Sequence, residues 1–88
     1  MDAASAWQEL FENWPSDAPK IGIIVTNYQE NIGFSDFMTA DGLLAVERDR
    51  PDSIGARKVI VAYTAILAVK MTDTGDLSNV ASLGFSRH

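Results

Sequence analysis

Hydrophobic residues recur every three or four positions near the start of the chain. Residues 3–14 place apolar side chains at the spacing of one helical face, with polar side chains between them. The apolar members are Ala6, Trp7, Leu10, Phe11 and Trp14. The pattern predicts an amphipathic helix over residues 3–14, which Pro15 ends. Because so short a helix is unstable alone, we expect its aromatic face to pack on the rest of the protein.

From residue 20 onward the pattern changes to an alternation of apolar and polar residues that is rich in β-branched side chains. This alternation, broken by turn-forming residues, predicts five short strands. They cover residues 21–28, 32–40, 43–48, 57–62 and 66–72. Asp41-Gly42 is a favoured hairpin turn between the second and third strands. Residues 49–56 form a loop, and residues 63–65 form a corner before the last strand.

The second and third strands carry apolar residues on both faces near Phe37, Leu43 and Leu44, more than a barrel with one solvated face needs. Simple alternation places Ile32, Phe34 and Met38 on one side. Phe34 and Phe37 have opposite parity, so one of them is expected to face away from the interior. The surplus indicates either a docked helix or a subunit interface.

Five antiparallel strands in so short a segment bury little surface as a flat sheet. We therefore expect a mainly β fold in which an N-terminal helix precedes a strongly bent, five-stranded antiparallel small barrel over residues 20–73. Residues 1–73 form one domain in this interpretation. Residues 74–88, with scattered apolar positions, are expected to be a partly ordered tail.

Composition excludes several function classes for this 88-residue chain. It has no cysteine and a single histidine, His88, so we expect no disulfide, thiol chemistry, metal site or cofactor. No nucleophile motif or glycine-rich phosphate loop precedes a helix, and we expect no enzyme. No apolar stretch is long enough for a membrane helix, and no secretory signal is apparent. We expect a cytoplasmic protein with no membrane contact.

The order of elements resembles the Sm-like small β-barrel family, which belongs to the SH3-like barrels. The resemblance covers residues 3–73, and residues 58–69 look like the family's fourth strand, tight corner and fifth strand. It implies a homo-oligomeric ring in which the fourth strand of one subunit pairs with the fifth strand of the next. The residues expected at that interface are Ile60, Ala62, Ile66, Leu67 and Val69.

The resemblance does not extend to the family's RNA-binding signatures. Residues 35–42 lack the asparagine of the usual turn after the second strand, and the Tyr63-Thr64-Ala65 corner lacks the Arg-Gly pair. RNA or another single-stranded nucleic acid therefore remains a ligand class that the family implies, without its usual uridine pocket.

Basic residues gather around the long loop. Arg48, Arg50, Arg57 and Lys58 are four of the seven Lys and Arg residues, and they are candidate phosphate contacts. The acidic residues interspersed among them also fit an ordinary solvated hairpin, and the net charge of the chain is −5.

Tyr28 and Tyr63 are the aromatic residues that we retain as candidate base-stacking contacts, since the helix aromatics are expected in the core. Two functions follow from the sequence. The first is a non-catalytic, ring-forming binding module with a nucleic-acid ligand. The alternative is a protein-interaction or structural subunit with no nucleic-acid role.

Overall fold

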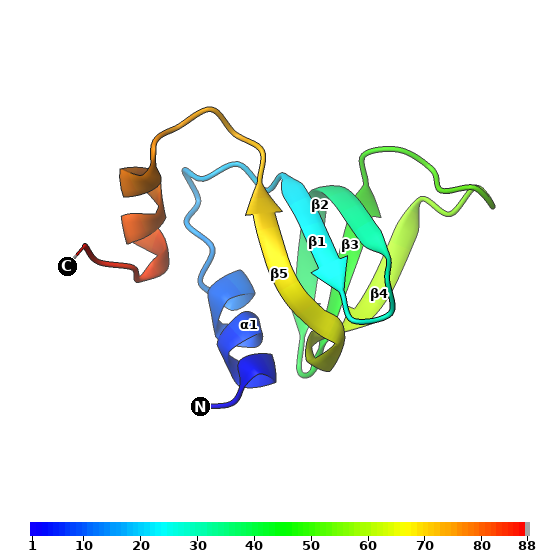
Figure 1. Ribbon diagram of the computed structural model, residues 1–88, viewed down its shortest axis with the longest axis horizontal. Helices are drawn as coiled ribbons and strands as arrows, with labels where there is room; N and C mark the ends of the chain where they lie inside the picture. The colour runs from blue at the N-terminus through cyan, green and yellow to red at the C-terminus, as the bar shows by residue number, and fades with distance from the viewer. Residues whose placement is uncertain (88) are drawn as a thin grey trace.

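A computed structural model describes residues 1–87, which form one helix followed by an antiparallel sheet (Figure 1). Helix α1 spans Ala3–Glu12, and Asp2 caps it by accepting a hydrogen bond from the Ser5 amide. The five strands are β1 (Gly22–Thr26), β2 (Asn31–Ala40), β3 (Leu43–Arg48), β4 (Lys58–Ala62) and β5 (Ile66–Met71). The predicted helix and the five predicted strands are thus confirmed, with ends shifted by up to two residues.

The sheet has the order β4-β3-β2-β1-β5, and every neighbouring pair is antiparallel. β4 and β5 are consecutive in the chain, yet they lie at opposite edges, joined by the short helix η1 (Tyr63–Ala65). The sheet is bent but not closed, so the expected closed barrel is not confirmed. Two strand edges are left without a partner in residues 1–87.

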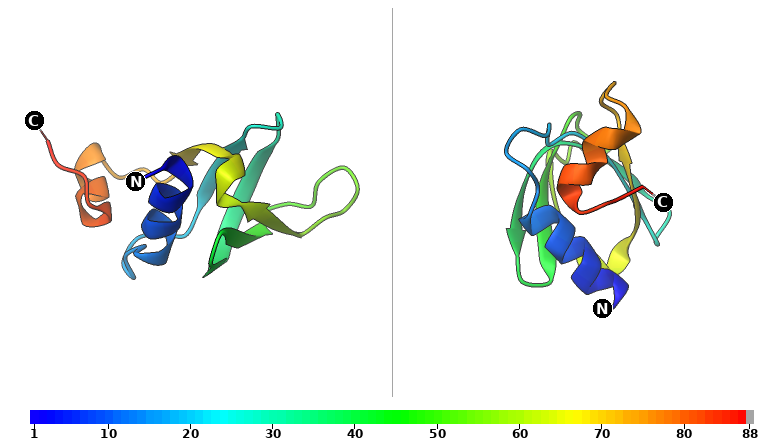
Figure 2. Two further views of the ribbon diagram at one scale, coloured as in Figure 1. Left: turned by 90° about the horizontal axis from the view of Figure 1, so that it is seen from below. Right: turned by 90° about the vertical axis from the view of Figure 1, so that its left-hand side faces the viewer.

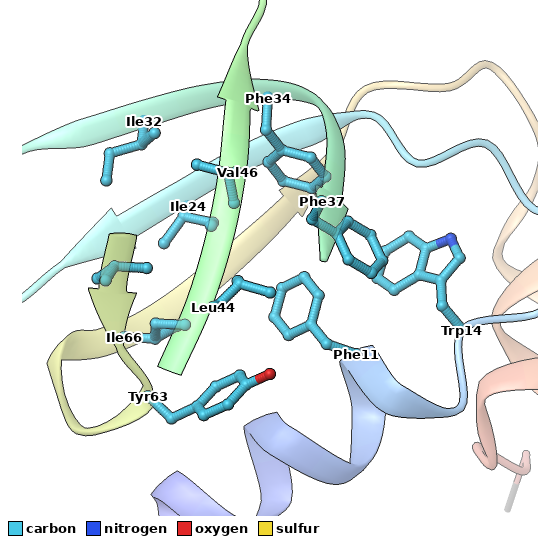
Figure 3. Packing of buried hydrophobic residues seen from close by; sticks show 11 residues of the cluster. Phe11, Trp14, Ile24, Ile32, Phe34, Phe37, Leu44, Val46, Tyr63 and Ile66 are labelled. Carbon is cyan, nitrogen blue, oxygen red and sulfur yellow. The ribbon is translucent and has the colours of Figure 1, made fainter. Parts of the chain in front are cut away.

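The core lies between the concave face of the sheet and α1 (Figure 3). Phe11 is at its centre, stacked on Trp14 at 5.6 Å and edge-on to Phe37 at 5.0 Å between ring centroids. Aliphatic residues from β1, β2, β3 and β4 complete the cluster: Ile24, Ile32, Leu44, Val46 and Val61. The prediction that the helix aromatics belong to the core is confirmed.

A bulge in β2 corrects the predicted arrangement of its side chains. The register with β3 shifts between Phe34 and Asp36, so alternation restarts after the bulge. Phe34 and Phe37 both face the core, and the expectation that one faces away is wrong. Met38 was expected on the same side of β2 as Ile32 and Phe34, but these two are buried while Met38 points outward. The Asp36 carboxylate stabilises the bulge by accepting a hydrogen bond from the Phe37 amide at 2.8 Å.

After β5 the chain turns back toward α1 and forms a second short helix, η2 (Leu77–Leu83), in the segment expected to be a partly ordered tail. Asp76 caps η2 by accepting a hydrogen bond from the Ser78 amide, and Leu83 packs against the core. Figures 1 and 2 show η2 beyond α1 at one end of the long axis. The loop between β3 and β4 projects from the other end. His88 lies outside the described residues.

Candidate interaction surface

The convex face of β2, β3 and β4 carries an unusual amount of exposed apolar surface. The register places Met38 opposite Ala45 and Ala45 opposite Ile60, which makes one row across three strands. The adjacent row contains Ala40, Leu43 and Ala62. We call these six residues the outer apolar face. Met38 is 77% exposed and Ile60 is 71% exposed, so nothing in residues 1–87 covers the row.

This face forms because β3 alternates strictly while both of its surfaces are apolar. Leu44 and Val46 point inward and are fully or almost fully buried, while Leu43 and Ala45 point outward. The reverse turn at Asp41-Gly42, with φ of +77° at Gly42, fixes this register. The Gly42 amide donates to the Gln8 side chain at 2.9 Å, which ties the turn to α1.

The two edge strands differ in what touches them. β4 ends the outer apolar face, and Ile60 stands on that edge. At β5, the Trp7 indole donates a hydrogen bond to the carbonyl of Ile66 at 3.0 Å. Helix α1 therefore contacts the start of the β5 edge through Trp7. Residues Leu67–Met71 lie past this contact along β5.

The residues expected at an oligomer interface separate into two groups. Ile60 and Leu67 are strongly exposed, and Ala62 is partly exposed. Val69 is partly buried against the core, and the Ile66 side chain belongs to the core. Ile66 can therefore contact a partner only through its backbone, and its carbonyl already accepts a hydrogen bond from the Trp7 indole.

The candidate nucleic-acid residues are not brought together as one basic surface. The Arg48 side chain is only 11% exposed and pairs with Glu30 at 3.5 Å, while its Nε donates to the carbonyl of Arg50. Arg48 therefore joins the end of β3 to the turn before β2. Arg50, Arg57 and Lys58 are exposed.

The two candidate tyrosines lie in different environments. Tyr63 is 1% exposed and faces Phe11, so its ring is not accessible to a ligand, which corrects the expectation from the sequence. Burial, reinforced by the Glu12 carboxylate, raises the pKa of Tyr63. Tyr28 is exposed at the turn after β1. Partial burial of its hydroxyl and the nearby Glu30 carboxylate raise the pKa of Tyr28.

Two hollows flank the β5 side of the molecule. One has a volume of about 720 Å³ and lies between Asp17, the end of β5 and η2. The other, of about 800 Å³, lies between α1, the start of β5 and residues 82–85. Within residues 1–87, no three or more His, Cys, Asp or Glu side chains are grouped as metal ligands. In the same part of the chain, no helix combines the length and apolarity needed to cross a bilayer.

No protein-family model, curated protein or solved structure matches this chain significantly. The sequence predicted surplus apolar residues on both faces of the second and third strands, but it did not predict that Met38 belongs to the outer apolar face, because Met38 was placed on the same side of β2 as Ile32 and Phe34. The opposite parity of Phe34 and Phe37 was the available signal, since a bulge lets both aromatic rings reach one core.

Proposed function

We propose that this protein is a non-catalytic assembly module, an Sm-like small barrel that forms a homo-oligomeric ring. In this proposal β4 of one copy pairs with β5 of the next. The observation that carries it is the open sheet, whose β4 edge coincides with an apolar face on which Ile60 is strongly exposed.

Unpaired strand edges readily accept further strands, and monomeric proteins usually protect them with charges, prolines or a covering segment. β4 has one charged residue, Lys58, and no proline. Exposed Ile60 continues into the row formed by Ala45 and Met38. Addition of a strand from another copy satisfies the edge amides and carbonyls and removes apolar surface from water.

The basic residues favour a protein partner over nucleic acid. Arg48 is engaged by Glu30, and Tyr63 is in the core. The accessible cations that remain lie within a chain whose net charge is −5, and such a balance disfavours approach to a polyphosphate.

The test is the mass of the purified protein in solution, measured by light scattering over a range of concentrations. We expect a mass several times 9.6 kDa for the wild type. Ile60→Asn is expected to shift the population to monomers, because it places a polar amide at the strand contact. The matched control is Ile54→Asn, at the exposed tip of the loop, which should leave the mass unchanged.

Two outcomes contradict the proposal. If the wild-type protein stays monomeric at high micromolar concentration, it does not self-associate, and the proposal is wrong. The second outcome is saturable, salt-sensitive binding of labelled single-stranded RNA, measured by fluorescence anisotropy and weakened by Arg50→Ala. That result would indicate that the protein binds nucleic acid.

A further inference from the structure

The hollow of about 800 Å³ beside the start of β5 is mainly apolar and open to solvent. It lies at the end of the molecule where α1 and the C-terminal segment meet (Figure 1). Its apolar wall includes Trp7 and Leu10 from α1, Leu67 from β5, and Leu83 and Phe85 from the C-terminal segment. Among the described residues that line it, Glu9 alone has a charged side chain.

The C-terminal segment brings an aromatic ring to this hollow without burying it. Gly84, with a φ of +99°, ends η2, and Phe85 follows it at the wall that the hollow shares with α1. Leu83 packs against the core, whereas Phe85 and Leu67 are each more than half exposed. Two large apolar side chains at one hollow are therefore in water in the single chain.

The proposed edge pairing fixes which faces of two copies meet. Neighbouring strands alternate in direction over the order β4-β3-β2-β1-β5, so β4 and β5 run the same way along one sheet. An antiparallel contact between β4 of one copy and β5 of the next therefore turns the second copy over. The outer face of β4 then continues into the inner face of β5, which is the side that α1 covers.

This facing brings the outer apolar face of one copy to the hollow of the next. The Trp7 indole occupies the Ile66 carbonyl, so the accessible part of β5 is Leu67–Met71. Complete pairing with β4, which is also five residues long, sets Ala62 opposite Leu67. The Ala62 side chain belongs to the outer face and so points to the side of the hollow. Leu43 is in register with Ala62 on that face, one strand spacing of about 4.8 Å farther from β5.

The other end of the paired strands matches by charge. Lys58 lies on the same outer face of β4 and comes opposite Met71, which packs on the inner side of β5. Met71 lines the hollow of about 720 Å³, in which Asp17, Asp73 and Asp76 are the charged side chains among the described lining residues. A cation therefore faces an acidic hollow, and the apolar row faces an apolar hollow.

We infer that the outer apolar face of one copy docks, through Ala62 and Leu43, into the hollow that α1, Leu67 and Phe85 form on a second copy of this chain. The docking rests on the proposed self-assembly and names the surface that receives the exposed apolar side chains. It also assigns the C-terminal segment, which lies outside the sheet, to the contact between copies.

Two substitutions outside the paired strands test the docking. Phe85→Ala is expected to weaken association roughly tenfold, because it removes an apolar ring that the contact takes out of water. Leu43→Ala should have a similar effect, although β3 takes no part in edge pairing. Ile54→Ala, at the exposed tip of the loop, is the matched control and leaves association unchanged. Light scattering over a dilution series measures all three, and thermal melting checks that each variant is folded.

Cysteine cross-linking tests the facing independently. The chain has no cysteine, so each introduced thiol is unique. Chains with Ala62→Cys and chains with Phe85→Cys are mixed at a concentration at which both associate. A short bis-maleimide should join them rapidly, because both thiols lie at one hollow. Met38→Cys is on the same outer face but two strands farther from β5, and should be joined to Phe85→Cys much more slowly.

The outcomes separate the docking from the assembly itself. A monomeric wild type overturns both proposals. An oligomer that Ile60→Asn dissociates, but that Phe85→Ala or Leu43→Ala leaves unchanged, overturns the docking and leaves the assembly. Cross-linking of Phe85→Cys to Met38→Cys as fast as to Ala62→Cys overturns the facing of the two copies.

Discussion

The two faces of β3 have nearly the same composition, but one face is buried and the other is exposed. On the concave face, Leu44 and Val46 are buried under α1 and the aromatic cluster. On the convex face, Leu43 and Ala45 lie in the open between Met38 and Ile60. The difference does not come from hydrophobicity, since both faces are apolar. It comes from α1, which packs on the concave face, whereas nothing in residues 1–87 covers Met38 and Ile60 on the convex face.

Matched substitutions at neighbouring positions on the two faces of β3 are expected to have the largest effects on folding. Leu44→Asp is expected to abolish folding, because it places a carboxylate without a partner in the core. Leu43→Asp should leave the chain folded, because position 43 faces solvent. Circular dichroism and thermal melting distinguish the two. A folded Leu44→Asp protein, or an unfolded Leu43→Asp protein, would reverse the assignment of the faces.

Removal of the ring at the centre of the covered face has the next largest effect. Phe11→Ala is expected to lower the free energy of unfolding by about 3–5 kcal/mol, because the cavity it leaves adjoins Trp14 and Phe37. Urea titration followed by tryptophan fluorescence measures the loss. A loss below about 1 kcal/mol would show that α1 does not seal the concave face.

Substitutions in the turn that sets which β3 residues face inward are expected to lower the stability by a smaller amount. Gly42 has a φ of +77°, a conformation that costs an L-residue about 1–2 kcal/mol. Gly42→Ala is expected to destabilise the protein by about that amount in urea titration. Gly42→Asn, which tolerates positive φ, should lose less, and equal losses would contradict the turn geometry.

The smallest expected effect is a pH dependence of the cap on the covering helix. The hydrogen bond from the Ser5 amide lowers the pKa of Asp2 below 3.8. The cap therefore stabilises the folded state above pH 3.8, and this contribution is lost as the pH falls through the lowered pKa. Melting temperatures between pH 5 and pH 2 should fall less steeply in Asp2→Asn, since asparagine caps without titrating. Identical profiles would show that Asp2 contributes nothing to helix stability.

Much of the fold was predictable because it depends on local patterns. The helical spacing of Trp7, Phe11 and Trp14 defined α1 and its buried stripe. Asp41-Gly42 defined the hairpin, and the Tyr63-Thr64-Ala65 corner separated the last two strands. Each signal acts over a few residues, within the range where backbone preference and hydrophobic period are informative.

The candidate interaction surface was only partly predictable. Ile60 and Leu67 were expected at a subunit contact, and both are exposed. Tyr63 and Arg48 were expected to reach a ligand, but the first lies in the core and the second pairs with Glu30. Neither placement depends on nearby sequence, because Phe11 is 52 residues from Tyr63 and Glu30 is 18 residues from Arg48.

The sequence by itself determined the order of the helix and strands and the turn between β2 and β3, and it contains no cysteine. The tertiary structure alone decided that a bulge turns Phe34 and Phe37 to one side, that Met38 points outward, and that Trp7 covers the start of β5. These features depend on contacts between distant segments. The physical reason is that side-chain alternation is a local rule, whereas a bulge and a covered edge exist only where a second strand or helix packs against the first.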